Sequence, residues 1–215
     1  VTSGPGIMRD RIYIIVPVAL ARAVMQIRAI GLGTDVIPSM GRGQEKPDPE
    51  TMKQPPRSRK QGLLNWPVIA HSYFFLGLIE AGFSLFLFFF VLYQGGWEWG
   101  QELGAGDPLY RSATGITLSS IILMQIGNLF GRRSHRGSGL DASVLRNPLI
   151  IAGIVFEIVF SWAILYFPPL GTVLGTGPVD VAVYGVAWLG VPLIFGLDFA
   201  RKRIFAAVEN KTHMR

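Results

Sequence analysis

Two glutamates lie near the middle of long apolar segments, where a charge is costly. Glu80 is central in the segment 66–93, and Glu157 is central in the segment 148–167. Moving a carboxylate out of water costs several kcal/mol unless it is protonated, paired or bound to a cation. We therefore interpret both glutamates as parts of an ion or proton path through a membrane. The alternative is a protonated glutamate that serves packing alone.

A third apolar segment, Thr114 to Phe130, carries regularly spaced polar side chains. Eleven residues make almost three helical turns, so Thr114 aligns with Gln125, and Thr117 aligns with Asn128. These four side chains form one polar stripe. The stripe either supplies oxygen atoms to the same path or holds helices together by hydrogen bonds, as such residues often do in membranes.

Four apolar segments are long enough to position these residues across a bilayer. A helix needs about 20 apolar residues to cross about 30 Å of hydrocarbon, where lipid offers the backbone no hydrogen-bond partners. A fifth segment, Ile12 to Met40, contains Arg22, Arg28 and Asp35 and is a weak span. The sequence predicts an all-α membrane bundle of about five transmembrane helices, the first broken or degraded. The expected spans are about 17–40, 66–93, 114–130, 148–167 and 179–197.

The composition also indicates a membrane protein. Half of the 215 residues are hydrophobic, mean hydropathy is +0.39, and only 16% are charged, which is too apolar for an ordinary soluble domain of this length. Cysteine is absent, which excludes disulfides and thiolate metal sites. The net charge of +6 arises from short basic runs between apolar segments. Membrane topology explains these runs better than nucleic acid does, so no nucleic-acid partner is expected.

Basic residues also predict the orientation, because lysine and arginine accumulate in cytoplasmic loops. Segments 41–65, 131–147 and 201–215 hold fifteen of the twenty lysines and arginines. The alternate loops, 94–108 and 170–178, hold none. The C-terminus is therefore expected in the cytoplasm.

The segment 30–57 combines features of a broken membrane helix and a charged loop. Gly31 and Gly33 flank Leu32, Thr34 and Asp35 follow, and a proline stands at position 38. Glycine loosens a helix, and proline removes a hydrogen-bond donor. Free carbonyls could then join Thr34 and Asp35 as hard oxygen ligands of a dehydrated cation.

This segment resembles the sixth transmembrane helix and following loop of P-type cation-transporting ATPases of the calcium and sodium/potassium pump type. The matching pieces are Val-Met-Gln-Ile at 24–27, Leu-Gly-Thr-Asp at 32–35, Ile-Pro at 37–38 and Met-Lys-Gln-Pro-Pro-Arg at 52–57. The resemblance continues through helices seven to ten, so it covers residues 17–205. Residues 1–16 are unmatched, 41–65 corresponds to a cytoplasmic loop, and 206–215 form a cytoplasmic tail.

The resemblance implies a set of cation ligands. Thr34 and Asp35 match ligands of the sixth pump helix, and Gln125 matches an eighth-helix ligand position with Asn128 beside it. Glu157 matches a ninth-helix glutamate linked to an additional sodium or proton site. Glu80 stands where the family often has glutamine. The resulting candidate metal-binding residues are Thr34, Asp35, Glu80, Gln125, Asn128 and Glu157.

Some positions depart from the family pattern. Gly31 replaces an aspartate or asparagine ligand, and Arg22 and Arg28 replace apolar residues. A lost ligand and an added cation should weaken cation binding. The chain also lacks the Asp-Lys-Thr-Gly-Thr loop that pumps phosphorylate. ATP and magnesium are therefore expected only in a full-length pump, and this chain is expected to be an inactive fragment, from a disrupted reading frame or otherwise.

Three functions compete. The first is the C-terminal membrane portion of an ATP-driven cation pump, with the lipid bilayer, the missing pump domains and an inorganic cation (calcium, sodium or potassium) as partners and the plasma membrane as location. The second is a non-transporting scaffold or regulatory protein derived from a pump. The third, a proton channel or secondary carrier using Glu80 and Glu157, is disfavoured because the sequence has no internal repeat.

Overall fold

A computed structural model describes residues 31, 43, 74–133 and 147–213, with side chains described up to residue 204. Segment 17–40, apart from Gly31, and the start of the segment 66–93 lie outside this part of the chain. The described part forms helices and no strand. Its elements are α4 (Gly77–Gln94), α5 (Pro108–Arg133), α6 (Pro148–Tyr166), α7 (Pro168–Leu174), α8 (Val181–Ala187) and α9 (Gly190–His213).

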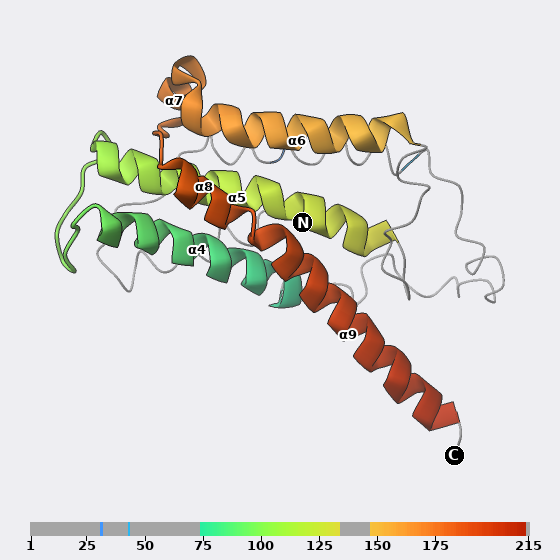
Figure 1. Cartoon of the computed structure of the whole chain (residues 1–215). Helices are drawn as coiled ribbons and strands as arrows, with labels where there is room; N and C mark the ends of the chain where they lie inside the picture. The colour runs from blue at the N-terminus through green and yellow to red at the C-terminus, as the bar shows by residue number, and fades with distance from the viewer. Residues whose placement is uncertain (1–30, 32–42, 44–73, 134–146, 214–215) are drawn as a thin grey trace, which may run out of the picture.

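Helix α5 is the centre of the described bundle. In its most apolar stretch 89% of the residues are buried, against 50% in the span of α4 and 33% in that of α6. Helices α4, α6, α8 and α9 all pack against α5, and Figure 1 shows it lying between α4 and α6. Residues of α5 therefore face protein on nearly every side, whereas each neighbouring helix has a face that is exposed on the outside of the bundle.

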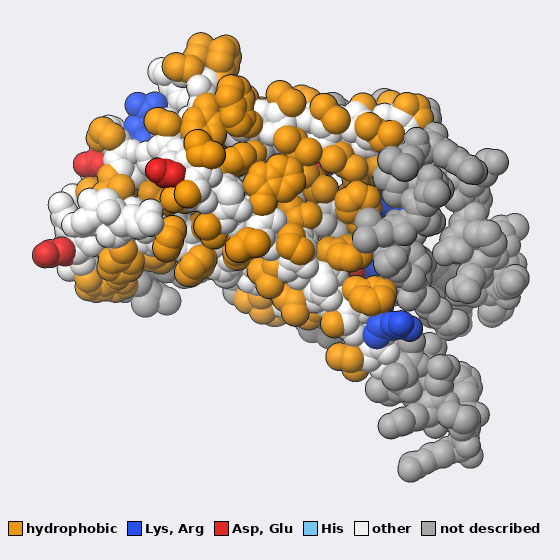
Figure 2. Space-filling model, in the orientation of Figure 1, with side chains coloured by type: hydrophobic (Ala, Val, Ile, Leu, Met, Phe, Trp, Pro, Cys, Tyr) orange, Lys and Arg blue, Asp and Glu red, His pale blue; other side chains and the backbone are white. Residues whose placement is uncertain are grey.

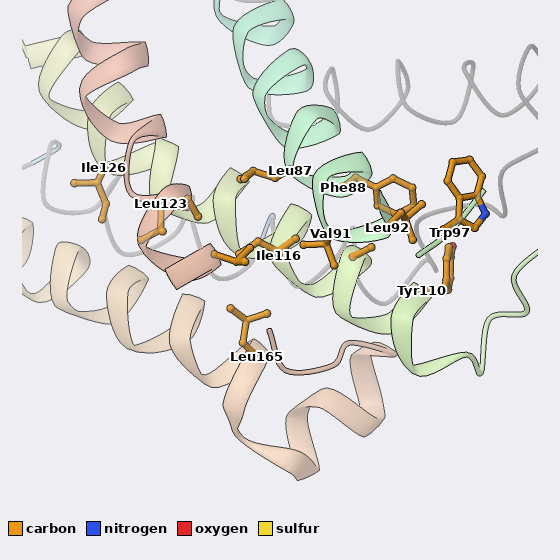
Figure 3. Packing of buried hydrophobic residues seen from close by; sticks show 13 residues of the cluster. Leu87, Phe88, Val91, Leu92, Trp97, Tyr110, Ile116, Leu123, Ile126 and Leu165 are labelled. Atoms are coloured by element: carbon orange, nitrogen blue, oxygen red, sulfur yellow. The ribbon is translucent and has the colours of Figure 1, made fainter. Parts of the chain in front are cut away.

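The main core lies where α4 meets α5. Leu87 and Phe88 of α4 are almost completely buried, as is Ile116 of α5. The same cluster extends to Trp97 in the following loop and to Leu165 of α6, as Figure 3 shows. This apolar packing fixes how α4 and α5 are placed against each other.

Glycines bring α9 close to α5. A Cβ atom on Gly127 would lie 2.6 Å from Ile194 Cγ2 and 2.7 Å from the Val191 carbonyl oxygen. A Cβ on Gly131 would lie 2.8 Å from the Asp198 carboxylate. Because glycine has no Cβ, the two backbones can approach closely, as small residues allow in membrane bundles.

The last span is broken, whereas the sequence suggested one continuous helix over 179–197. Helix α8 ends at Ala187 and α9 begins at Gly190. At the break the Leu189 amide bonds the Val186 carbonyl (3.0 Å), and the Val191 amide bonds the Trp188 carbonyl (3.1 Å). Pro192 has no N–H to offer in the usual helical position, so these tighter contacts replace the regular ladder.

Four helical stretches are long and apolar enough to cross a membrane: Phe74–Gln94, Pro108–Arg133, Pro148–Tyr166 and Val181–Ile204. The predicted helical membrane bundle is thus confirmed for the described residues. Helix α5 extends beyond the predicted 114–130 at both ends. At the start of the helix, Asp107 Oδ1 accepts a hydrogen bond from the Leu109 amide (2.8 Å). In the last turn, the positive charges of Arg132 and Arg133 interact favourably with the partial negative charge of the helix C-terminus.

Consecutive spans run in opposite directions. The loop between α4 and α5 lies at the same end of the bundle as α7, while the end of α5 and the start of α6 lie at the other (Figure 1). Hydrophobic side chains cover most of the face shown in Figure 2, between charged groups near the two ends. Large apolar side chains such as Phe86, Val159 and Trp162 are exposed, which suits a lipid environment.

Candidate functional site

Three of the predicted ligand residues meet between α4 and α5. Gln125 Nε2 donates a hydrogen bond of 3.1 Å to Glu80 Oε1. Asn128 Nδ2 donates to the same oxygen and also to Gln125 Oε1 at 3.3 Å. The three side chains therefore form one connected group, which we call the amide–carboxylate triad.

Helical spacing and packing explain why these residues converge. Gln125 and Asn128 are three residues apart on α5 and share one face. Glu80 lies in the first turn of α4 and is 4% exposed, although α4 is otherwise largely apolar. The apolar contacts between α4 and α5 bring the two faces together, so the triad forms inside the bundle.

The triad is suited to holding charge inside the membrane. Two N–H groups, one from Gln125 and one from Asn128, point at the same carboxyl oxygen of Glu80. Glu80 and Asn128 are buried, whereas Gln125 is partly exposed. Amide and carboxylate oxygens are also the ligands that hard cations prefer. The arrangement thus brings carboxyl and amide oxygen atoms together inside the bundle.

The break between α8 and α9 lies next to the triad. The Cα of Gly190 faces Phe83 of α4 and Met124 of α5, because an added Cβ would meet both side chains within 3 Å. Gly127, located between Gln125 and Asn128, faces the Val191 carbonyl. The close approach of Val191 to Gly127 therefore lies beside Gln125 and Asn128 along α5.

Glu157 is placed on another helix. It is completely buried on α6, and the triad's hydrogen bonds join α4 to α5. One turn beyond Glu157, Ser161 Oγ lies 2.7 Å from Ser119 Oγ of α5 and 3.3 Å from the Tyr184 hydroxyl of α8. The structure thus brings Glu80, Gln125 and Asn128 together and places Glu157 near a separate group of hydroxyls.

The threonines of the predicted stripe contribute differently from the amides. Thr117 donates to the Ala113 carbonyl of its own helix at 2.6 Å. Thr114 is buried at 1% exposure. The hydrogen-bonded triad therefore contains only the Gln125 and Asn128 end of the predicted stripe.

A buried ion pair in the middle of α9 was missed in the sequence. Asp198 Oδ2 lies 2.9 Å from Lys202 Nζ, and Asp198 Oδ1 lies 2.9 Å from Arg201. Lys202 Nζ also donates to the Gly131 carbonyl at the end of α5. The spacing of four residues between Asp198 and Lys202 was the available signal, since such residues share a helix face. This group, the α5–α9 clamp, ties two helices together.

Thr34 and Asp35 lie outside the described residues, so their placement stays a prediction. Within the described ranges, no three histidine, cysteine or acidic residues gather into a metal-binding group. The acidic part of the triad is the single carboxylate of Glu80. A cation bound at the triad would therefore also need the amide oxygens of Gln125 and Asn128 and ligands from residues outside the triad.

The sequence was compared with known proteins. The family model for the C-terminus of cation transporting ATPases matches residues 21–204. The chain is 30% identical to the human potassium-transporting ATPase alpha chain 2 over 89% of this chain and 21% of that protein. It is 27% identical to the Xenopus laevis potassium-transporting ATPase alpha chain 1, over 86% of this chain and 20% of that protein.

A third relative is the chicken sodium/potassium-transporting ATPase subunit alpha-2, which is 26% identical over 93% of this chain and 22% of its own length. The chain therefore spans about a fifth of the length of these relatives. The family match covers most of the chain and all four described spans. This membrane-embedded chain belongs to the family of cation transporting ATPase C-termini, as the resemblance predicted.

Proposed function

We propose that this chain is the C-terminal membrane portion of an ATP-driven cation pump and supplies part of its cation-binding site. The observation that carries the proposal is the amide–carboxylate triad, which joins Glu80 to Gln125 and Asn128 within the membrane bundle. A hydrogen-bonded group with a buried carboxylate inside membrane helices is the usual mark of an ion or proton path. The family match and the relatives' names support a cation as the transported species.

Other parts of the proposal concern residues outside the triad. Thr34 and Asp35 would add ligands from the preceding helix, and Glu157 would serve a further sodium or proton site. The loop 41–65 would couple the site to a phosphorylation domain, and ATP with magnesium would act only in a complete pump. The transported cation would be calcium, sodium or potassium. We place the chain in the plasma membrane with its C-terminus in the cytoplasm.

A scaffold or regulatory role is the second candidate, favoured by two sequence features. Gly31 stands where the family has a ligand, and Arg28 adds a positive charge to the same segment. Both changes should lower cation affinity. Under this alternative the triad would only hold α4 and α5 together.

Cation-dependent unfolding separates the two candidates. The purified 215-residue chain is heated in detergent with sodium, potassium or calcium chloride, and with choline chloride at equal ionic strength. A cation site weakened as expected has a dissociation constant of about 10 mM, so 100 mM of the right cation adds about 1.4 kcal/mol to the free energy of unfolding. The Gln125→Leu variant should lose this increment because it lacks the amide oxygen.

The control is Gln101→Leu, which changes an exposed glutamine outside the spans and should keep the increment. Equal unfolding temperatures in all salts, for the unmodified chain and both variants, would support the scaffold instead. Micromolar stabilisation that depends on Asp35 would show that the site is intact rather than weakened. The same preparation should form no phosphoenzyme from ATP.

A further inference from the structure

The triad contains two amides whose orientation needs an explanation. An amide side chain has an oxygen that accepts hydrogen bonds and an NH2 group that donates them, and the two ends have nearly the same shape. A carboxylate oxygen that receives two hydrogen bonds can only accept. Glu80 Oε1 receives one bond from Gln125 Nε2 and one from Asn128 Nδ2. Glu80 therefore decides which end of each amide faces α4.

The orientation of the NH2 groups also decides where the amide oxygens point. Asn128 Nδ2 uses its two N–H groups on Glu80 Oε1 and on Gln125 Oε1. Gln125 Oε1 accepts one long bond of 3.3 Å, and a carbonyl oxygen has a second lone pair. Gln125 is also the partly exposed member of the triad. Its carbonyl oxygen therefore keeps a lone pair that can bind a cation.

We propose that Glu80 is a positioning residue: it holds the NH2 ends of Gln125 and Asn128 so that the Gln125 carbonyl oxygen is presented to an inorganic cation. This inference rests on the proposed function, because it assigns the role of Glu80 at the same site. It differs from direct ligation, since the Oε1 atom of Glu80 is already engaged by two donors. Glu80 acts on the cation through the amides.

A glutamine at position 80 would remove this control while keeping the shape. A glutamine can turn either its oxygen or its NH2 group toward α5. Three amides could then adopt several hydrogen-bonded arrangements, and the Gln125 oxygen would face the cation in only some of them. The buried negative charge would also be lost, which lowers the attraction for any cation nearby.

The experiment follows the amide NH2 groups directly. The full chain, labelled with ¹⁵N at glutamine and asparagine side chains, is placed in detergent micelles in choline chloride. The hydrogen exchange and chemical shifts of the Gln125 and Asn128 NH2 groups are measured by NMR. The Glu80→Gln variant should exchange both groups about tenfold faster and shift both signals, because a neutral acceptor holds N–H groups more weakly than a carboxylate.

Ser84→Ala is the matched control. Ser84 is buried on the same helix, one turn from Glu80, and its hydroxyl bonds the Ala81 carbonyl of α4. The control removes a buried polar group from α4 without touching the amides, so both NH2 signals should stay as they are. Circular dichroism and size-exclusion chromatography show whether each variant folds. If Glu80→Gln does not fold, Glu80→Asp replaces it: the shorter carboxylate should move both signals toward faster exchange.

A titration with sodium, potassium or calcium chloride forms the second arm. In the unmodified chain the Gln125 signal should move with one of these cations, and Glu80→Gln should need about tenfold more cation for the same movement. Altered NH2 groups without any cation response would leave the orientation by Glu80 standing and contradict the cation site. Unchanged NH2 groups in Glu80→Gln would overturn the positioning role, whether or not a cation binds.

Discussion

At the scale of single residues, Lys202 is a buried basic residue that joins two helices of the described bundle. Its ammonium group lies between the Asp198 carboxylate, at 2.9 Å, and the carbonyl of Gly131 at the end of α5. Helix C-termini carry partial negative charge and unpaired carbonyls, so a buried cation there meets both an ion and a dipole. The α5–α9 clamp thus fixes the end of the helix that carries Gln125 and Asn128.

Removing this one charge should destabilise the chain. In Lys202→Met the Gly131 carbonyl loses this donor and Asp198 loses its ion pair with Lys202, so the free energy of unfolding should fall by about 3 kcal/mol. Unfolding by sodium dodecyl sulfate in mixed micelles measures it. Arg203→Met is the control, because Arg203 is exposed and only lies over the Phe199 ring at 5.5 Å. It should cost less than about 1 kcal/mol, and an equal loss in both variants would contradict the clamp.

At the scale of the elements, the contact between α5 and α9 depends on glycines that sequence reasoning left aside. Gly127→Ala would place a Cβ 2.7 Å from the Val191 carbonyl, which belongs to backbone and cannot swing away. Overpacking of this kind costs about 1 to 3 kcal/mol. The same detergent unfolding assay, with Gly196→Ala on α9 as the control, measures the effect.

Gly196 has no atom within 4 Å of an added Cβ. Alanine there should be neutral or stabilising by up to about 1 kcal/mol, because it favours helix over glycine. Should Gly127→Ala prove as stable as Gly196→Ala, the close approach of α9 to α5 would be wrong. A drop confined to Gly127→Ala would locate the contact beside the triad.

The elements also show what the sequence could and could not predict. Hydropathy finds spans because any apolar helix of sufficient length is stable across the hydrocarbon core of a bilayer. It does not detect the break at Trp188–Leu189, because the residues around Gly190 and Pro192 remain apolar. The stripe on α5 predicted that Gln125 and Asn128 share a face. It could not show that this face meets Glu80, since the pairing of helix faces depends on packing between α4 and α5.

At the scale of the whole molecule, the charges predict how the bundle lies in the membrane. The loop between α4 and α5 is acidic, with exposed Glu98 and Glu102, and contains no lysine or arginine. The opposite end carries Arg132 and Arg133 on α5 and Arg203 on α9. The antiparallel order of the spans separates these two groups (Figure 1). Basic residues stay in the cytoplasm, so the two ends should differ in their access to reagents.

The absence of cysteine makes this orientation directly measurable, because each introduced cysteine is the sole thiol. Glu98→Cys and Arg203→Cys place a thiol at exposed positions at opposite ends of the bundle. In intact cells a membrane-impermeant maleimide should label Glu98→Cys and leave Arg203→Cys unlabelled until the membrane is permeabilised. The reverse pattern would invert the topology and place the C-terminus outside. Labelling of both thiols in intact cells would instead show that an even number of the three intervening spans, Pro108–Arg133, Pro148–Tyr166 and Val181–Ile204, crosses the membrane, which contradicts the predicted topology.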